Sequence, residues 1–377
     1  MLFPYTYVPH QMEKMQKFID FIFFEVWSKA QPNIPFGLDL FDAEPELREV
    51  MEAFFYSDAQ GADFFFRHVE RIYEFFSALT PPQIAQFQGW YRGNNDLEKV
   101  CANDPAADLA RYVDVAATYP ELENLLATFF KGLYSKSLLD LAPLRAKIGE
   151  IDDHYQAFVS ANNSGRCPFC GISPLLGEYT TKRDAYDHYL PKALYPFNSI
   201  NFRNLVPACH HCNSSYKTSK NPAYVQKDPA GEAVRRKVFY PFSTTPYAID
   251  VQVTFDHADI EKLMPAEIKL TFGPTNLSEQ IETWKDVYGI DERYREKLLN
   301  GDGKAWLVEI RDEWRWHDES AGEDGRTPDE YLRAVQRHTE RSPYANENFL
   351  KNGFLQACKN AGVFAPIAKL EAAPPIP

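Results

Sequence analysis

The stretch that decides the fold runs from Cys167 to Lys217 and reads CPFCGISPLLGEYTTKRDAYDHYLPKALYPFNSINFRNLVPACHHCNSSYK. It contains two Cys-x-x-Cys pairs, Cys167/Cys170 and Cys209/Cys212. Each pair can place two thiolates on one side of a tetrahedral ion, so the four residues predict a closed structural zinc site. The segment between the pairs is longer than a bare zinc ribbon needs. We therefore expect the functional residues to lie in the segment between the two Cys pairs.

The enclosed segment is predicted to form a strand, a long loop, a second strand and a helix. Residues 186–190 are strand-like and end at Pro191, which cannot donate to a ladder. Residues 204–207 indicate the second strand. The helix is expected from Cys209 onward, because no Pro or Gly follows until Pro222.

At these residues the sequence resembles the HNH endonucleases of the ββα-metal superfamily, in the form that adds a four-cysteine zinc staple. The resemblance rests on the Asp187-His188 pair, on Asn204, on Asn213 directly after the second Cys pair, and on the trailing Lys217. It implies that His188 is the general base and that Asp187 and Asn213 hold a divalent ion against the scissile phosphate. Asn204 would tie the long loop to the second strand through backbone hydrogen bonds. Lys217, the implied phosphate ligand, stands one residue later than in the shorter family pattern.

The chemistry of phosphodiester hydrolysis agrees with these residue types. The reaction needs a base that titrates near neutral pH, which His supplies, and a cation that offsets charge on the phosphoryl oxygens. A carboxylate and an amide oxygen are hard ligands, so Mg²⁺ or Mn²⁺ is the expected catalytic ion and Zn²⁺ the structural one. Because neighbouring residues on a strand point to opposite faces, Asp187 and His188 can share one site only near the strand's end or at a twist.

Two other interpretations of this stretch remain open at the level of sequence. The four cysteines could form an inert zinc staple without catalysis, in which case Asp187, His188 and Asn213 would occur together by chance. His210 or His211 could also replace a cysteine as a zinc ligand.

The charge is distributed unevenly along the chain. The net charge is −13, yet residues 161–240 carry +6 and the remainder −19. A basic centre in an acidic frame fits an enzyme that contacts phosphates only near its active site, and fits poorly with a protein that coats long DNA. The predicted nucleic-acid contacts are the basic residues of this centre, Lys182, Arg183, Lys192, Arg203, Lys217 and Lys220.

The rest of the chain predicts an α+β protein, mainly helical, around the central ββα unit. Residues 1–150 show apolar stripes at helical spacing, rich in Phe, and form an all-helical domain. Residues 151–225 hold the HNH core, entered through a helix over 143–162 on which His154 is expected to be solvated. Residues 226–377 begin with strands over 238–242, 248–255 and 267–272, which could form a small antiparallel sheet, and then return to helix.

The composition indicates which class of protein this chain belongs to. A hydrophobic fraction of 45% and an aromatic fraction of 15% predict a packed globular protein. The most apolar stretch, residues 18–27, is interrupted by Asp20 and Glu25, so we expect neither a signal peptide nor a membrane span. Cys101 and Cys358 are expected to be reduced thiols in a cytoplasmic protein.

The sequence therefore predicts a metal-dependent endonuclease that cuts or nicks DNA, with 5′-phosphate and 3′-hydroxyl ends as the resemblance implies. Bacterial chains of this construction resemble anti-phage defence or mobile-element nucleases, so antiviral defence and a protein partner that licenses cutting are secondary expectations. One alternative is a catalytically inactive zinc-stapled nucleic-acid-binding or adaptor module. Another is an RNA-cutting toxin with the same site.

Overall fold

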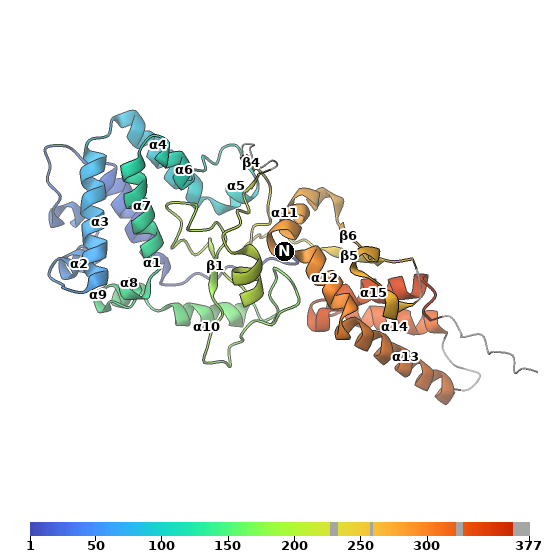
Figure 1. The fold of residues 1–377 in the computed structure, drawn as a ribbon. Coiled ribbons are helices and arrows are strands. Elements are labelled where there is room, and N and C mark those ends of the chain that lie inside the picture. The colour runs from blue at the N-terminus through green and yellow to red at the C-terminus, as the bar shows by residue number, and fades with distance from the viewer. Residues whose placement is uncertain (227–232, 257–258, 322–326, 365–377) are drawn as a thin grey trace, which may run out of the picture. The chain divides into compact units, whose positions relative to one another are not determined.

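The structure is a computed structural model, and it describes residues 1–226, 233–256, 259–321 and 327–364. The chain divides into two compact units (Figure 1). The first comprises Met1–Tyr247 and Glu279–Tyr288, and the second comprises Ala248–Ser278 and Gly289–Pro377. The predicted ranges 1–150 and 151–225 thus lie together in one unit. The predicted range 226–377 is divided between the two.

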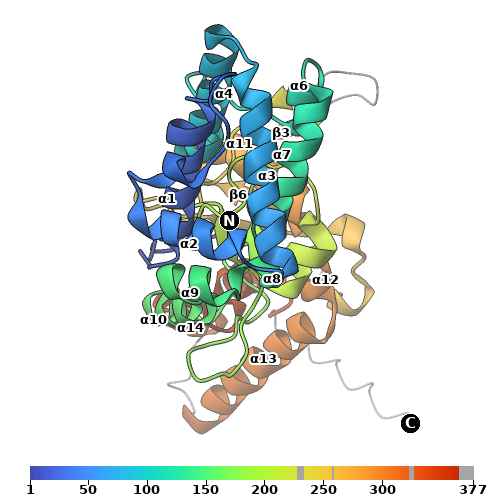
Figure 2. The same ribbon diagram turned by 90° about the vertical axis from the view of Figure 1, so that its left-hand side faces the viewer.

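The N-terminal part of the first unit is helical, as the sequence predicts. Figure 2 shows its two long central helices, α3 and α7, running side by side. Proline occupies the first turn of α2, α4, α7 and α9, where its missing N–H costs no hydrogen bond. The helices are α1 (Glu13–Phe21), η1 (Ile22–Trp27), η2 (Leu38–Phe41), α2 (Pro45–Phe55), α3 (Gln60–Ser77), α4 (Pro81–Asn95), α5 (Leu97–Cys101), α6 (Tyr112–Ala116), α7 (Pro120–Gly132), α8 (Lys136–Leu139), α9 (Ala142–Ile148) and α10 (Ile151–Ala161).

Aromatic side chains fill the core between these helices. Trp27 is fully buried, stacks on Phe76 at a centroid distance of 6.0 Å and meets Phe129 at 5.5 Å. Trp27 also donates its indole N–H to the carbonyl of Val69 at 3.0 Å, so its polar atom is satisfied. The Phe-rich stripes thus contribute to the core through Phe54, Phe65 and Phe76, whereas Phe55 is 55% exposed.

One helix boundary differs from the prediction. The expected helix over 143–162 is divided into α9 and α10 at Gly149, whose φ of 75° lies in the left-handed region. Only glycine adopts that conformation without strain, so the chain turns there. His154 of α10 is then buried at 3% exposure, and the expectation that it is solvated is wrong.

The strands of the first unit are short and antiparallel. Strand β1 (Tyr186–His188) pairs with β2 (Leu205–Pro207), and His188 is opposite Leu205. The helix that follows, η3 (His211–Lys217), is a π-helix of seven residues. Strands β3 (Tyr224–Gln226) and β4 (Ala233–Arg235) form a second pair. The order strand, loop, strand, helix is as predicted, within a mainly helical α+β chain.

The second unit contains a two-stranded sheet packed against helices. Strand β5 pairs with β6, and α15 packs so closely on β5 that a Cβ on Gly353 would approach the Val251 carbonyl to 2.5 Å. Only glycine permits that approach. The elements are β5 (Asp250–Thr254), η4 (Ile260–Lys262), η5 (Pro265–Glu267), β6 (Lys269–Gly273), η6 (Thr275–Leu277), α12 (Ile290–Leu299), α13 (Gly301–Ala321), α14 (Pro328–Glu340), η8 (Ala345–Glu347) and α15 (Asn348–Asn360).

The predicted strand over 238–242 is wrong. This segment is irregular and belongs to the first unit, where Val238 donates its backbone N–H to the Cys101 carbonyl at 2.9 Å. The Pro241 carbonyl accepts from the Tyr5 N–H at 2.7 Å. These long-range bonds take the place of a ladder partner. Across the described ranges, no helix is both long and apolar enough to cross a membrane.

Candidate metal centre and active site

The four cysteines of the two Cys-x-x-Cys pairs come together in one buried cluster. All four Sγ atoms lie within 4.8 Å of one another, and the Sγ atoms of Cys170 and Cys209 are 4.0 Å apart. Zn–S bonds of about 2.3 Å in a tetrahedron place sulfurs about 3.8 Å apart, so the donor set and its spacing fit a structural zinc ion. Within the described residues the cluster contains cysteines alone, and His210 and His211 are exposed.

Local backbone geometry builds the two cysteine turns. After the first pair, Gly171 donates its N–H to the Cys167 carbonyl at 2.7 Å with a φ of 70°. In the second pair, the Cys212 N–H approaches the Cys209 sulfur at 3.4 Å. Such N–H···S contacts stabilise thiolates, which are the form that binds zinc.

Helix α11 (Ser278–Tyr288) covers the first cysteine turn, although it is more than a hundred residues away in sequence. Trp284 donates its indole N–H to the Phe169 carbonyl at 2.6 Å, and the Tyr288 ring stacks on Phe169 at 4.9 Å. At the N-terminal end of the chain, Leu2 donates its N–H to the Pro168 carbonyl at 2.8 Å. The residues between Cys167 and Cys170 are thus held from two distant segments.

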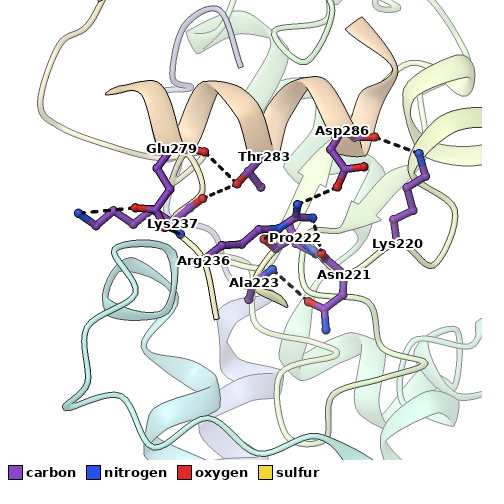
Figure 3. Close-up of polar contacts among 9 residues, drawn as sticks. All are labelled: Lys220, Asn221, Pro222, Ala223, Arg236, Lys237, Glu279, Thr283 and Asp286. Carbon is purple, nitrogen blue, oxygen red and sulfur yellow. Dashed lines mark hydrogen bonds and ion pairs between the residues drawn. The ribbon is translucent and has the colours of Figure 1, made fainter. Parts of the chain in front are cut away.

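Polar contacts fix the outer side of α11 to the segment that follows η3, as Figure 3 shows. Arg236 pairs with Asp286 at 2.7 Å and also donates to the Asn221 carbonyl at 3.0 Å. Lys220 donates its ammonium to the Asp286 carbonyl at 3.0 Å. Lys220, one of the predicted nucleic-acid contacts, therefore has a partner within the chain.

The side chain of Asn204 joins the long loop to the end of β1. Its Oδ1 accepts the Leu190 N–H at 2.7 Å, and its Nδ2 donates to the Leu190 carbonyl at 3.0 Å. The Asn204 carbonyl accepts the Tyr189 N–H at 2.8 Å, and the residue is fully buried. The resemblance implies that Asn204 ties the long loop to the second strand, and in the structure its side chain bonds to the backbone of Leu190, at the start of that loop.

Asp187 forms a buried ion pair with Lys217. The Lys217 ammonium lies 2.8 Å from Asp187 Oδ1 and 2.8 Å from the His188 carbonyl, and the two side chains are 1% and 4% exposed. Burial raises the pKa of Asp187, and the Lys217 charge partly offsets that rise. Asp187 Oδ2 is also buried and has no hydrogen-bond partner among the described residues. An unused buried carboxylate oxygen is a candidate cation ligand.

The π-helical turn of η3 explains how Lys217 reaches Asp187. A π-helix holds one more residue per turn than an α-helix, and Cys212 and Lys217, five residues apart, are the buried residues of η3. The same turn thus presents Cys212 to the four-cysteine cluster and the Lys217 ammonium to Asp187. The resemblance implies a phosphate contact for Lys217. In this structure its ammonium instead lies inside the ion pair.

His188 is oriented by a backbone carbonyl. Its Nε2 lies 2.9 Å from the Ser199 oxygen, and since a carbonyl can only accept, Nε2 carries the hydrogen and Nδ1 keeps its lone pair. The ring meets Tyr134 edge-on at 5.0 Å. Burial, followed by the nearby Lys192 charge, lowers the pKa of His188 to about 3, so the imidazole is neutral near pH 7.

The remaining predicted site residues do not all lie together at one site. Among the described contacts, the Asn213 side chain forms no hydrogen bond to Asp187 or His188, and it is half-buried on η3. Lys192 lies over the Tyr134 ring at 5.6 Å, which places it near His188. Arg183 pairs with Asp152 at 2.6 Å, and Arg203 donates to the Tyr240 hydroxyl at 3.2 Å.

The loop that follows the first cysteine turn in sequence carries two exposed side chains. Lys182 is exposed, and its ammonium has no partner among the described residues. Tyr179, three residues before it, is 94% exposed.

Sequence reasoning missed Tyr134 and Ser199. Tyr134 is 54 residues before His188, and Ser199 acts through its backbone oxygen, so spacing carries no signal for either. Both also have a buried hydroxyl without a hydrogen-bond partner in the described structure. The exposed loop tip at Tyr179 could have been found, since residues 177–182 combine Gly, Thr and charged residues around one Tyr.

Comparison of the chain with protein-family models, with curated proteins and with solved structures finds no match.

Proposed function

We propose that the protein is a metal-dependent HNH-type endonuclease that hydrolyses phosphodiester bonds in DNA, with a structural zinc ion in its four-cysteine centre. The observation that carries the proposal is the bond from His188 Nε2 to the Ser199 carbonyl, because it leaves Nδ1 as a proton acceptor. The antiparallel β1–β2 pair, with Asp187 and His188 on β1 and η3 following β2, supports it.

In the proposed hydrolysis, His188 and Lys192 have different roles. Nδ1 of His188 takes a proton from water as the water oxygen bonds to phosphorus. The P–O3′ bond breaks, and the departing O3′ takes a proton from a solvent water, which leaves a 3′-hydroxyl and a 5′-phosphate. His188 then releases its proton to solvent. A phosphate bound nearby would bring negative charge close to the imidazole, which raises the pKa of His188 from its low value and makes it a stronger base. Lys192, half-buried beside the site, supplies positive charge for that phosphate.

The residues present fit a divalent ion through the unused Oδ2 of Asp187. Asp187 and Asn213 would hold the ion, and when bound it would offset charge on the phosphoryl oxygens. In the structure, the Lys217 ammonium lies beside Oδ1 of Asp187 and balances the charge of the buried carboxylate.

The same Lys217 contact favours a second candidate function. The Lys217 ammonium is bonded to Asp187, and the Asn213 side chain is not. This arrangement suits a zinc-stapled nucleic-acid-binding module without catalysis. In that case Lys217 would remain the only cation at Asp187.

One assay separates the candidates. Purified protein with Mg²⁺ or Mn²⁺ is incubated with supercoiled plasmid, linear DNA and RNA, and the ends of any product are mapped. We expect metal-dependent DNA cleavage that is weakened in Asn213→Ala and partly restored by more metal. RNA cleavage alone would indicate the toxin alternative, and binding without cleavage would indicate the inactive module.

The biological setting is part of the proposal. The basic stretch 161–240 inside an acidic chain supports contact with DNA near the active site alone. A role in bacterial antiviral defence, in the cytoplasm and with a protein partner that licenses cutting, is consistent with that limited contact.

A further inference from the structure

We propose that the C-terminal end of α4 positions the active site, because Asn94 and Asn95 hold the loop whose Ser199 carbonyl sets the tautomer of His188. The inference rests on the proposed function only for its catalytic consequence. The positioning itself concerns the orientation of one imidazole and can be measured separately.

Asn94 fixes the start of this loop. It is fully buried, and its Nδ2 donates to the Pro196 carbonyl and to the Ala110 carbonyl, each at 2.8 Å. Its Oδ1 accepts the Ala110 N–H at 2.9 Å, so every polar group of the side chain is used. The backbone oxygen of Asn94 accepts from Nδ2 of Asn198 at 3.1 Å.

Asn95 fixes the residues on either side of Ser199. Its Nδ2 donates to the Phe197 carbonyl at 3.2 Å, and its Oδ1 accepts from Nδ2 of Asn201 at 2.9 Å. Two adjacent asparagines at the end of one helix thus bind both flanks of the 196–201 segment. A third contact comes from Asn204, whose Nδ2 donates to the Asn198 carbonyl at 3.2 Å.

Phe197 shows that the loop is held in a conformation it would not adopt alone. Its φ of 78° lies in the left-handed region, which is strained for a bulky residue and persists only when the surroundings enforce it. The enforcing contacts include its ring, fully buried against Phe23, Tyr91 and Phe130 at centroid distances of 5.2 to 5.6 Å.

Together these contacts form a continuous path from the helical region to the base. Asn94 and Asn95 hold residues 196–198 by hydrogen bonds, and Ser199 follows directly with its oxygen 2.9 Å from His188 Nε2. The helices before residue 150 therefore do more than enclose a core. They complete the site that the zinc-stapled segment carries.

The test uses the full-length zinc-loaded protein and the variants Asn94→Leu and Asn95→Leu. The first readout is the ¹⁵N spectrum of the histidine rings, with His188 assigned by comparison with His188→Gln. We expect wild type to show the Nε2–H tautomer and the variants a mixture. The second readout is cleavage, in which kcat should fall about tenfold to a hundredfold while KM changes less than threefold.

The matched control is Asn162→Leu. Asn162 also joins distant segments with its amide, accepting the Thr6 N–H at 2.8 Å and donating to the Thr6 carbonyl at 2.9 Å, but it does not touch the 196–201 loop. It should lower the melting temperature without changing the His188 tautomer or kcat.

Two results would overturn the inference. One is an unchanged Nε2–H tautomer and wild-type kcat in folded Asn95→Leu, and the other is a tautomer change of equal size in Asn162→Leu. If wild type cleaves nothing, the proposed function fails, while a tautomer shift confined to Asn94→Leu and Asn95→Leu still supports the positioning role.

Discussion

At the scale of single residues, the buried pair of Asp187 and Lys217 is the most consequential contact in the candidate site. Both charges are out of water, and each depends on the other for compensation. Replacing one partner leaves an unpaired buried charge, which costs far more than the pair itself contributes.

We predict that Lys217→Met destabilises the protein by about 3 to 5 kcal/mol. The double variant Asp187→Asn/Lys217→Met should recover much of that loss, because the stranded carboxylate is gone. Chemical denaturation of both single variants and the double variant gives the coupling energy. Additive losses would show that the two groups do not depend on one another.

His154 gives a prediction about pH. Burial, followed by the His10 charge, lowers the pKa of His154 to about 4, and its Nδ1 bonds to the Tyr186 hydroxyl. Since the folded pKa lies below the unfolded value of about 6.5, the unfolded state binds more protons between these values. Stability should be complete above pH 6.5 and fall by about 3 kcal/mol as pH drops to 4.

The measurement is denaturation of wild type and His154→Gln across pH 4 to 7. Gln cannot titrate, so the variant should show a shallower loss of stability on acidification. Equal slopes for the two proteins would mean that His154 is not held neutral by burial.

At the scale of elements, the sequence predicted features that depend on local patterns but not those that depend on long-range contacts. The Cys-x-x-Cys spacing predicted the metal cluster, because each pair acts within one turn, and β1 and β2 were found near their predicted positions. The strand over 238–242 was predicted wrongly, since its apolar residues pack on distant segments instead of a neighbouring strand. The Asn94–Asn198 contact spans 104 residues and leaves no mark on local sequence.

Helix α11 offers the sharpest test at this scale. Trp284→Phe removes the hydrogen bond to the Phe169 carbonyl and should cost about 1 to 3 kcal/mol, because that carbonyl stays buried. We also expect faster transfer of zinc to a chromogenic chelator, since Phe169 lies between the two cysteines of the first turn. Glu282→Ala, on the exposed side of the same helix, is the control and should change neither quantity. Equal zinc-transfer rates in wild type and Trp284→Phe would show that the Trp284 contact of α11 does not stabilise the metal centre.

At the scale of the whole molecule, the four-cysteine cluster, whose geometry fits a structural zinc ion, lies within one compact unit. The four cysteines lie in the unit of Met1–Tyr247 and Glu279–Tyr288, while the other unit contains no residue of the cluster. Metal ligation by thiolates contributes folding free energy to the unit that contains it.

We therefore predict two responses to zinc removal. Calorimetry of the full chain after chelation should show a transition of the first unit at lower temperature, while the transition of the second unit stays within a few degrees. Re-addition of Zn²⁺ should restore the first transition. A uniform shift of both transitions would show that the two units unfold together.

The most direct test of the central claim is plasmid cleavage by wild type and His188→Ala, matched for zinc content, with and without Mn²⁺. We predict that wild type cuts only with Mn²⁺, leaving 5′-phosphate ends, and that His188→Ala retains zinc and fold but loses at least a hundredfold in rate, about the contribution of a general base. Cleavage by His188→Ala at the wild-type rate would contradict the assignment of His188 as the base, and absence of cleavage by zinc-loaded wild type on any nucleic acid would contradict the nuclease itself.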